Sequence, residues 1–336
     1  MTAPVVGFLG PNGTFSEAAA QRLASSWAGE LVPVASIINL IQSVTDDFVL
    51  KEPFQLDAAV VPIENSTEGS VGATLDTLVD HEDLVITAEL DLPIEQLLVA
   101  RAGLDLASIE QVYSHPQGIA QTRRFLAEHL PNAGIVPTSS TSKSVQIVTE
   151  STEPWAAIGS RRAAELYGAT ILRDDISEQV NVTRFVLVER RGAPVDRSAR
   201  IGLVETVAVT DGGVVEATDP VAEGAVGGEP ARQRRADDAG SDRPMKTSVV
   251  FQGQGDGSPG WLVRCLSEFA FRRVNLSKIE SRPLRGHLGH YRFFIDMEGS
   301  ATDPDPADAI EGLRHHATDV RILGSYPVAG QPVAHS

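Results

Sequence analysis

Cysteine and aromatic residues are scarce in this sequence. Cys265 is the only cysteine, so the chain forms no internal disulfide and has no set of cysteine ligands for a metal. Aromatic residues make up 5% of the total. No apolar run approaches the roughly 20 residues of a membrane-spanning helix, and the first ten residues lack the basic segment of a signal peptide. These absences predict a cytoplasmic protein without a membrane partner.

Positive charge is scarce as well. The chain has 28 lysine and arginine residues against 45 aspartate and glutamate residues, which gives a formal net charge of −17. A field of that sign disfavours binding to the phosphate backbone of a nucleic acid. The sequence also contains no His, Asp and Glu set at metal-ligand spacing and no Gly-x-Ser-x-Gly elbow. We therefore expect no nucleic-acid partner, no metal and no serine hydrolase.

Apolar residues are plentiful, at 42% of 336 residues, and the length predicts two domains. In the first region, short apolar runs alternate with segments of helical periodicity. The predicted strands cover residues 5–9, 57–61, 109–113, 133–136, 155–158 and 182–188. This alternation is typical of an α/β fold with mainly parallel sheets. In such sheets, ligands bind beyond the carboxyl ends of the strands.

Residues 193 to about 244 have a different composition. Between positions 211 and 229 there are five acidic residues and no basic one, among many Gly, Ala and Val. The segment lacks aromatic residues and sustained periodicity, so we predict a largely disordered linker with bounds at 190–244. Residues 199–209 are apolar enough to form a strand, which leaves their structure open.

A regular pattern returns over residues 245–328, and residues 329–336 form a tail. Predicted strands at 246–251, 274–279, 291–297 and 320–323 alternate with two predicted helices. In the first helix, Ser258 is the predicted N-cap and Pro259 the first helical residue. Leu262, Cys265, Leu266 and Phe269 share one apolar face of that helix. The order βαββαβ predicts a ferredoxin-like domain.

Five polar motifs lie at predicted strand ends in the first region. They are Gly10-Pro11-Asn12-Gly13-Thr14-Phe15-Ser16-Glu17, Val61-Pro62-Ile63-Glu64-Asn65-Ser66-Thr67-Glu68-Gly69-Ser70-Val71, Ser114-His115-Pro116-Gln117, Ser139-Ser140-Thr141 and Asn181-Val182-Thr183-Arg184-Phe185. Each has an ordinary structural alternative, such as a helix cap, a polar turn, a structural histidine or a plain strand. Together they present hydroxyls, amides and one imidazole, which suits a small polar anion.

In this order, the motifs resemble the signature of the prephenate dehydratase family. Further on, Gly260-Trp261-Leu262-Val263, Asn275-Leu276 and Glu280-Ser281-Arg282-Pro283 resemble that family's ACT regulatory domain. The resemblance covers residues 4 to about 190 and 245 to 328. It implies a bilobed catalytic region at residues 3–189, similar to a periplasmic binding protein, with the active site in the cleft.

The resemblance implies decarboxylating dehydration of prephenate to phenylpyruvate, CO2 and water, without a cofactor. Thr183 matches the family's catalytic threonine. We expect its hydroxyl to donate a hydrogen bond to the departing oxygen, because threonine is too weak an acid to protonate that oxygen alone. The matching substrate-binding positions are Thr14, Asn65, Ser66, Thr67, Ser114, His115, Gln117, Ser140, Thr141, Arg184 and Phe185.

Prephenate is a dianion, so a chain with a net charge of −17 needs a local excess of positive charge to bind it. Arg184, His115, Lys143 and backbone N–H groups at helix starts are the candidates. Two of them have a structural alternative. Arg184 either binds substrate or pairs with an acidic neighbour in the fold, and Lys143 either lies near the cleft or faces solvent.

The resemblance further implies feedback regulation by L-phenylalanine, bound across the interface of a homodimer or homotetramer. The effector positions are Gly260, Trp261, Leu262, Val263, Asn275, Leu276, Glu280, Ser281, Arg282 and Pro283. Trp261 replaces the alanine of the family motif, and it either points outward harmlessly or alters effector affinity. The linker is longer than the family norm.

Two other functions stay open at this point. An arogenate dehydratase would perform the same elimination on a substrate that carries an amino group. A non-catalytic protein would use the same cleft and sensor for binding alone. An assay with prephenate and arogenate decides between the two dehydratase activities, and phenylpyruvate formation excludes the non-catalytic function.

Overall fold

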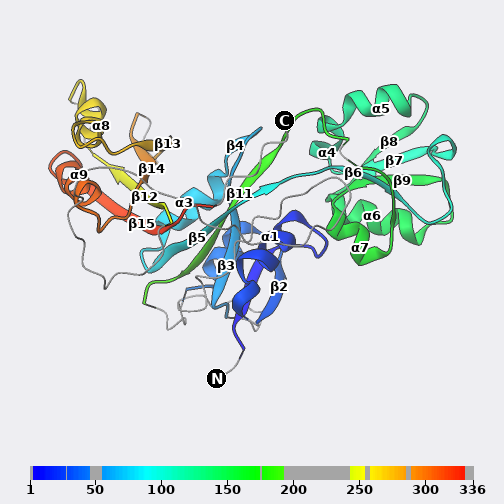
Figure 1. Cartoon of the computed structure of the whole chain (residues 1–336), viewed down its shortest axis with the longest axis horizontal. Helices are drawn as coiled ribbons and strands as arrows, with labels where there is room; N and C mark the ends of the chain where they lie inside the picture. Colours follow the sequence, from blue (N-terminus) through cyan, green and yellow to red (C-terminus); the bar gives the residue numbers. More distant parts are fainter. Residues whose placement is uncertain are drawn as a thin grey trace, which may run out of the picture.

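The computed structural model describes residues 3–27, 29–45, 55–174, 176–192, 243–253, 258–284 and 289–329. The predicted linker and tail therefore lie outside the described residues, except for a few positions at their ends. In the described ranges the chain forms three sheets, which follow one another along an elongated molecule (Figure 1). None of the helices in these ranges is long and apolar enough to cross a membrane.

The first lobe, in the middle of Figure 1, is built on a sheet with strand order β2-β1-β3-β11-β5. Its strands are β1 (Val5–Leu9), β2 (Glu30–Val34), β3 (Ala58–Asn65), β4 (Gly69–Ser70), β5 (Leu84–Pro93) and β11 (Val182–Arg190), and its helices are α1 (Phe15–Leu23), η1 (Ser25–Trp27), α2 (Ile37–Gln42) and α3 (Gly72–Asp80). Helix α1 covers one face of this sheet, and α2 and α3 cover part of the other. Because both faces are covered, the start of β3 is a continuous buried apolar run.

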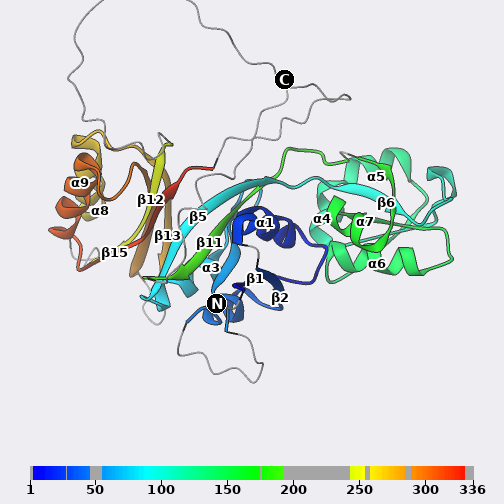
Figure 2. The same cartoon turned by 60° about the horizontal axis from the view of Figure 1, so that its bottom comes forward.

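The second lobe has its own sheet, with strand order β10-β6-β9-β7-β8. Its strands are β6 (Leu97–Ala100), β7 (Gln111–Ser114), β8 (Gly134–Pro137), β9 (Trp155–Gly159) and β10 (Thr170–Arg173), and its helices are η2 (Leu106–Ser108), α4 (Pro116–Gln121), α5 (Arg123–His129), α6 (Thr141–Glu150) and α7 (Arg161–Tyr167). The chain enters this lobe after β5 and returns through β11 (Figure 2). This arrangement confirms the bilobed α/β prediction.

The prediction of mainly parallel sheets is wrong. Strand β1 is parallel to β2 and β3, but β11 is antiparallel to both β3 and β5. The reason is the path of the chain, because β11 comes back from the second lobe and enters the first sheet from the opposite end. In the second lobe, β6 is likewise antiparallel to β9 and β10.

The C-terminal domain has the predicted βαββαβ order. Its elements are β12 (Met245–Gln252), α8 (Trp261–Phe271), β13 (Leu276–Pro283), β14 (Tyr291–Glu298), α9 (Pro304–Arg314) and β15 (Asp319–Pro327), with strand order β13-β14-β12-β15. The start of α8 differs from the prediction, because Gly260 is the N-cap, at φ 76°, and the helix begins at Trp261. Helices α8 and α9 pack together on one face of this sheet (Figure 2).

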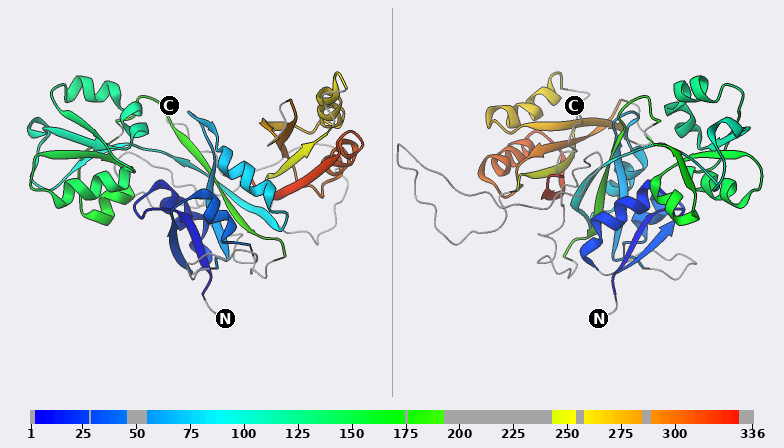
Figure 3. Two further views of the ribbon diagram at one scale, coloured as in Figure 1. Left: turned by 180° about the vertical axis from the view of Figure 1, so that it is seen from behind. Right: turned by 45° about the vertical axis from the view of Figure 1, so that its right-hand side comes forward.

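The other face of the C-terminal sheet lies against the first lobe. Val250, Phe294, Leu323 and Tyr326 of the C-terminal domain share one buried cluster with residues of β3, β5, β11 and α3. At Gly324 the strands approach so closely that an added Cβ would lie 2.0 Å from the carbonyl oxygen of Ile86. The two sheets therefore share part of one apolar core. The first lobe is thus held between the second lobe and the C-terminal domain (Figure 3).

Cys265 is expected to be chemically inert in the folded protein. Its side chain is buried in the core between α8 and the sheet, and burial raises the pKa of its thiol to about 11. At pH 8 the thiol is therefore both protonated and inaccessible. An aromatic disulfide reagent should react at least about 100-fold more slowly with the native chain than with the chain in denaturant. Equal rates in the two conditions would contradict this burial.

Candidate active site

Thr183 and Asn65 lie side by side at the end of the first sheet from which the chain passes to the second lobe. We call this the cleft end, and the face that carries both side chains the cleft face. They are register partners, with Thr183 at the start of β11 and Asn65 at the end of β3. The side-chain amide of Asn65 donates to Thr183 Oγ1 at 2.8 Å and to Asn181 Oδ1 at 2.7 Å. Its oxygen accepts the backbone N–H groups of Thr67 and Glu68 at 2.9 and 3.0 Å. Every polar atom of the Asn65 amide is thus engaged, which fixes the orientation of the amide.

The Thr183 hydroxyl is poised to donate a hydrogen bond. Its oxygen accepts from Asn65, and its proton has no acceptor among the residues that the structure describes. The side chain is 8% exposed, so it is almost completely surrounded by protein. A hydroxyl whose oxygen already accepts an amide N–H is polarised toward donation. An atom that enters from the cleft is the remaining partner for this proton.

A β-bulge places Asn65 on the cleft face. The register of β3 with β11 shifts between Pro62 and Glu64, so Ile63 is an extra residue in the strand. The carbonyl of Ile63 accepts the backbone N–H of Val71 instead of a β11 donor, at 2.9 Å. Since successive side chains alternate between the faces of a sheet, this insertion reverses the alternation beyond it. Proline has no N–H to donate, which explains why the ladder breaks next to Pro62.

Ser66 links the Asn65 motif at the end of β3 to the Asn181 motif at the start of β11. Its backbone N–H donates to the carbonyl of Val182 at 2.8 Å, and its hydroxyl accepts the N–H of Val182 at 2.9 Å. Ser66 and Thr67 are both exposed on the surface of the molecule. We call Asn65, Ser66, Thr67, Asn181 and Thr183 the first-lobe cluster.

A second polar cluster lies around Gly118 in the second lobe. A Cβ added to Gly118 would lie 2.6 Å from Ser114 Oγ and 3.6 Å from both Thr141 Cγ2 and Gln96 Oε1. The Ser114 hydroxyl is buried and donates to the carbonyl of Ile158 at 3.1 Å. Gln96 is 3% exposed, and its Oε1 has no partner in the described part of the chain. Sequence reasoning missed Gln96, because a lone glutamine between two strands carries no motif.

Thr14, His115 and Ser140 each cap a helix. Each is an N-cap, of α1, α4 and α6 respectively, and its side chain accepts the N–H of Glu17, Gln117 or Lys143. These caps set where the three helices begin, directly after β1, β7 and β8. Lys143 itself is exposed and donates to Gln146 at 3.0 Å, so the solvent-facing alternative is the one observed.

The two lobes touch through the loop that carries Thr14. The Ser160 hydroxyl donates to the carbonyl of Gly13 at 2.7 Å, and the Ser142 hydroxyl donates to the carbonyl of Asn12. Arg162 pairs with Glu17 at 2.8 Å. The starts of α1, α6 and α7 therefore meet between the lobes, and helix starts favour negative charge. Sequence reasoning singled out neither Ser142 nor Ser160 nor Arg162, because only folding brings the second lobe to this loop.

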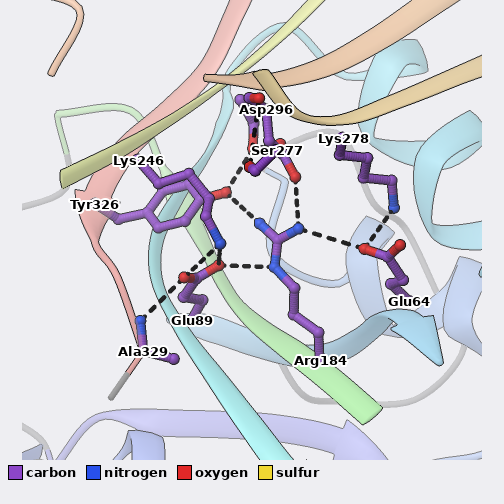
Figure 4. A network of polar contacts seen from close by, with 10 residues as sticks. Glu64, Glu89, Arg184, Lys246, Ser277, Lys278, Asp296, Tyr326 and Ala329 are labelled. Atoms are coloured by element: carbon purple, nitrogen blue, oxygen red, sulfur yellow. Dashed lines mark hydrogen bonds and ion pairs between the residues drawn. The ribbon is translucent and has the colours of Figure 1, made fainter. Parts of the chain in front are cut away.

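Arg184 does not belong to the cleft. It points to the opposite face of the sheet, where it donates to Glu89 at 2.7 Å, Asp296 at 2.5 Å and the Tyr326 hydroxyl at 2.8 Å (Figure 4). Burial disfavours the charged guanidinium, but Tyr326, Asp296 and Glu89 outweigh this effect, so the pKa of Arg184 lies above its ordinary value. All three guanidinium nitrogens are engaged. The geometry therefore supports the alternative in which Arg184 pairs with acidic neighbours, and not substrate binding.

Phe185 is also removed from the cleft. It is 2% exposed and packs in the cluster beneath α1, together with Leu90 and Leu92 of β5. Its contribution to the site is to hold the start of β11 against the sheet. Gln117 is half-buried on the first turn of α4, next to its cap His115.

The predicted effector residues form two groups in the C-terminal domain. Gly260, Trp261, Leu262 and Val263 line a cavity of about 360 Å³ together with Tyr291 and Phe293. Trp261 points inward, packs on Phe251 and Phe293, and donates to the carbonyl of His316 at 2.6 Å, so the outward alternative is wrong. Within one chain, the residues that line this cavity do not include those of β13.

The second group of effector residues lies on or beside β13. Asn275 pairs with Glu298 at 2.8 Å, just before the strand. Arg282 binds Asp76 of α3 through two hydrogen bonds, at 2.8 and 3.2 Å. Its guanidinium also covers Gly72, where an added Cβ would lie 2.6 Å from Nη2. The effector motif therefore contacts the helix that follows the Asn65 motif.

Known proteins resemble the chain over nearly its whole length. The family model described as prephenate dehydratase matches residues 6–193. A prephenate dehydratase from Mycolicibacterium vanbaalenii is 35% identical over 336 aligned residues, which cover 96% of this chain and 91% of that protein. One from Mycobacterium tuberculosis is 34% identical over 324 residues, with 96% and 86% coverage.

Solved structures give the same picture. A crystal structure of prephenate dehydratase from Arthrobacter aurescens in complex with L-Phe is 36% identical, with a TM-score of 0.73 and coverage of 97% of this chain and 90% of that one. A protein described as a novel type of quorum-quenching acylase has a TM-score of 0.72 over 97% of this chain and 98% of its own, but is 24% identical. That second likeness shows the fold alone, because one fold can host unrelated reactions.

Replacement of Asp91 by asparagine is expected to stabilise the chain at neutral pH. Asp91 is the register partner of Arg184 on β5, and burial, followed by the charge of Glu89, raises its pKa above the ordinary value of 3.8. A raised carboxyl pKa means that ionisation destabilises the folded state. This penalty is complete above the folded pKa and disappears as the pH falls below the ordinary value.

The melting temperature of Asp91→Asn should therefore exceed that of the unchanged chain at pH 7, and the gain should shrink as the pH falls toward 4. Circular dichroism at several pH values measures both effects. Asp308→Asn, on the exposed side of α9, is the matched control and should show no gain. An Asp91→Asn melting temperature at or below that of the unchanged chain at pH 7 would rule out the raised pKa.

Proposed function

The chain belongs to the prephenate dehydratase family, and we propose that Thr183, oriented by Asn65, is its catalytic residue. The family's enzymes are hydro-lyases that convert prephenate to phenylpyruvate, CO2 and water. The single observation that carries the proposal is the contact of 2.8 Å in which Asn65 donates to Thr183 Oγ1 and leaves the hydroxyl proton unpaired among the described residues.

The reaction requires a hydrogen-bond donor at the departing oxygen. Loss of the ring carboxylate as CO2 leaves the bonding electrons to flow into the ring, and the para hydroxyl departs at the opposite end. Hydroxide is a poor leaving group, so the barrier falls when a hydrogen-bond donor stabilises the oxygen as its bond to carbon breaks. Thr183 supplies that donor, and Asn65 compensates by donating to the threonine oxygen as negative charge builds there. Aromatisation drives the reaction, so no redox equivalent is consumed.

The substrate's two carboxylates need partners, and Arg184 is already occupied. We assign this task to the helix starts that meet between the lobes, above all that of α6, which is ten residues long, because the start of α1 already carries the buried carboxylate of Glu17. Thr141, at the start of α6, completes the lining from the second-lobe cluster, whereas the Ser114 hydroxyl already donates to Ile158 and Gln96 Oε1, which has no partner among the described residues, is an acceptor. Such a site attracts anions without basic side chains, which suits a chain with a net charge of −17.

Closure of the lobes belongs to the same proposal. The contacts of Ser142, Ser160 and Arg162 with the loop at residues 12–17 hold the lobes together on one side of the cleft. A closed cleft excludes water and strengthens the hydrogen bond from Thr183 to the departing oxygen. We further propose a cytoplasmic location, since its relatives are enzymes of amino-acid biosynthesis.

We also propose that L-phenylalanine regulates the chain through the C-terminal domain. The support is the L-Phe complex of the Arthrobacter aurescens relative and the cavity of about 360 Å³ lined by Gly260, Trp261, Leu262 and Val263. Phe271, Val263, Ile279 and Tyr291 expose large apolar side chains on the same domain. A second copy of the chain that covers them would bring its own β13 to the cavity, which explains why the two effector motifs are separate within one chain.

Thr183→Ala should abolish most of the turnover. Removal of the donor is expected to lower kcat for prephenate by about 10²- to 10⁴-fold, with a much smaller change in KM. Thr183→Ser keeps the hydroxyl and is the matched control, which should recover much of the lost rate. Formation of phenylpyruvate, followed by its ultraviolet absorption, measures both. Parallel assays with arogenate decide the substrate preference.

A folded Thr183→Ala chain with near-normal kcat would remove the catalytic assignment. Circular dichroism checks that the variant has the melting temperature of the unchanged chain. If prephenate is not converted by the unchanged chain while arogenate is, the substrate assignment is wrong but the role of Thr183 stays under test with the other substrate.

L-Phenylalanine should bind the unchanged chain and lower its turnover of prephenate, because only differential affinity for two states shifts their balance. Trp261→Ala restores the residue of the family motif and enlarges the cavity, so it should change the dissociation constant for L-phenylalanine without changing kcat in its absence. Calorimetry gives the binding constant and light scattering gives the oligomeric state. Prephenate kinetics that are indifferent to saturating L-phenylalanine would exclude the regulatory role.

A further inference from the structure

Two residues next to the proposed catalytic pair point their side chains to the far face of the sheet, opposite the cleft face. Arg184 follows Thr183 on β11, Glu64 precedes Asn65 on β3, and the two are register partners just as Thr183 and Asn65 are. Because side chains alternate along a strand, the pair Thr183–Asn65 faces the cleft while the pair Arg184–Glu64 faces the C-terminal domain. The two pairs therefore lie back to back on the same segment of backbone.

The far-face pair is bound by the C-terminal sheet. Arg184 donates to Asp296 of β14 at 2.5 Å and to Tyr326 of β15 at 2.8 Å (Figure 4). Glu64 lies 3.0 Å from Lys278 of β13, the strand that also carries the predicted effector residues from Glu280 onward. Each contact joins the first lobe to a different strand of the C-terminal domain.

Glu89 completes this arrangement from β5. It accepts from Arg184 at 2.7 Å, from Lys246 of β12 at 2.8 Å and from the backbone N–H of Ala329 at 3.0 Å. All four strands of the C-terminal sheet, β12 to β15, thus contribute a contact to one polar cluster. We call Glu64, Glu89, Arg184, Lys246, Lys278, Asp296 and Tyr326 the interdomain cluster.

Burial makes the contacts of Arg184 stiff, whereas the Glu64 side chain is 37% exposed, so its ion pair with Lys278 is partly screened by water. The Arg184 side chain is 10% exposed, that of Glu89 0% and that of Asp296 7%. A buried charge that loses its partner is strongly destabilised, so the partners have to move together. If the C-terminal sheet shifts on the first lobe, Arg184 and Glu64 follow it, and the backbone of their neighbours Thr183 and Asn65 follows as well. A displacement of about 1 Å at a reacting group is enough to change a rate by about 100-fold.

We propose that Arg184 and Glu64 are positioning residues through which the C-terminal sheet sets the hydrogen bond between Asn65 and Thr183, and that the effector acts on turnover by this route. The proposal rests on the catalytic assignment of Thr183. It connects the catalytic pair to the C-terminal domain by a route that does not pass through the cleft. It also explains why the arginine beside the catalytic threonine is committed to another domain.

The test alters the cluster from the C-terminal side, away from the cleft. Asp296→Asn removes one charge, and Tyr326→Phe removes one hydroxyl, with little change in shape. Both should lower kcat for prephenate about fivefold or more while KM changes by less than about threefold, and both should weaken inhibition by saturating L-phenylalanine about fivefold or more. Calorimetry should show that L-phenylalanine still binds, because neither residue lines the effector cavity.

Arg184→Lys and Arg184→Met test the same link from the first lobe. Lysine keeps the charge but cannot bridge Glu89, Asp296 and Tyr326 at once, so it should retain more turnover than methionine and less than arginine. Arg191→Met is the matched control. Arg191 lies just beyond the other end of β11 and donates to the carbonyl of Ile322 in the C-terminal domain at 3.2 Å, but it has no catalytic neighbour. It should leave kcat, KM and inhibition unchanged.

Three results would overturn the proposal. The first is a lower melting temperature for Asp296→Asn and Tyr326→Phe with unchanged kcat and unchanged inhibition, which is the behaviour of a purely structural brace. The second is loss of inhibition in Arg191→Met. The third is loss of inhibition in Asp76→Asn but not in Asp296→Asn, which would assign the coupling to Arg282 and helix α3 instead.

The outcomes separate this proposal from the proposed function. Turnover that survives in Thr183→Ala removes the catalytic assignment, whatever the interdomain variants do. With that assignment intact, unchanged kinetics of both Asp296→Asn and Tyr326→Phe remove the coupling alone. If Asp296→Asn does not give a cooperative melt, Tyr326→Phe decides, since it deletes a single oxygen. If L-phenylalanine does not bind the unchanged chain, the fall in kcat without effector still tests the positioning role.

Discussion

The pairing of β3 with β11 is the constraint on which the rest of the structure depends. It brings together segments 118 residues apart and sets Asn65 opposite Thr183. The same register sets Glu64 opposite Arg184 on the other face. A slip of one residue would exchange the two faces, so that charged groups would enter the cleft and neutral groups would meet the C-terminal domain. The buried apolar residues of β3 and β11 pack into the cores on both faces of the sheet, and this packing holds the register in place.

The bulge at Ile63 interrupts the regular pairing of β3 with β11 and thereby sets the face on which Asn65 lies. If Ile63 were a regular strand residue instead of a bulge, strict alternation along β3 would direct Asn65 toward the C-terminal domain and Glu64 toward the cleft. The irregularity lies beside Pro62, whose carbonyl accepts the hydroxyl of Thr74 at 2.6 Å. An interruption of the ladder at the site is therefore part of its construction, and α3 is tied to it.

Charges are distributed unequally between the two faces. The cleft face uses hydroxyls, amides and helix starts, whereas the far face collects Arg184 and its acidic partners in a buried cluster. Because the Arg162–Glu17 pair between the lobes compensates its own charge, a cleft lined by hydrogen-bond donors can bind an anion and still stabilise new negative charge on a departing oxygen. An ionic contact on the far face is directional and depends on all its members, which makes it sensitive to a shift between domains. Each face thus has the chemistry that suits its task.

Sequence alone determined the βαββαβ order of the C-terminal domain, the α/β class of the first region, the five polar motifs and the family resemblance that implied two lobes, because these depend on local periodicity and on contiguous residues. In the first region it named six strands and missed β2, β4, β5, β6 and β10. It also named the cap alternative for Thr14 and Ser140 and a structural role for His115. Only the tertiary structure decided that Arg184 belongs to the interdomain cluster, that Phe185 and Trp261 are core residues, that Ser160 and Arg162 contact the loop of Thr14, and that Gln96 lies beside Gly118. The physical reason is that strand direction, the bulge and the packing of one sheet on another fix which face each side chain occupies, and these are properties of contacts between distant segments.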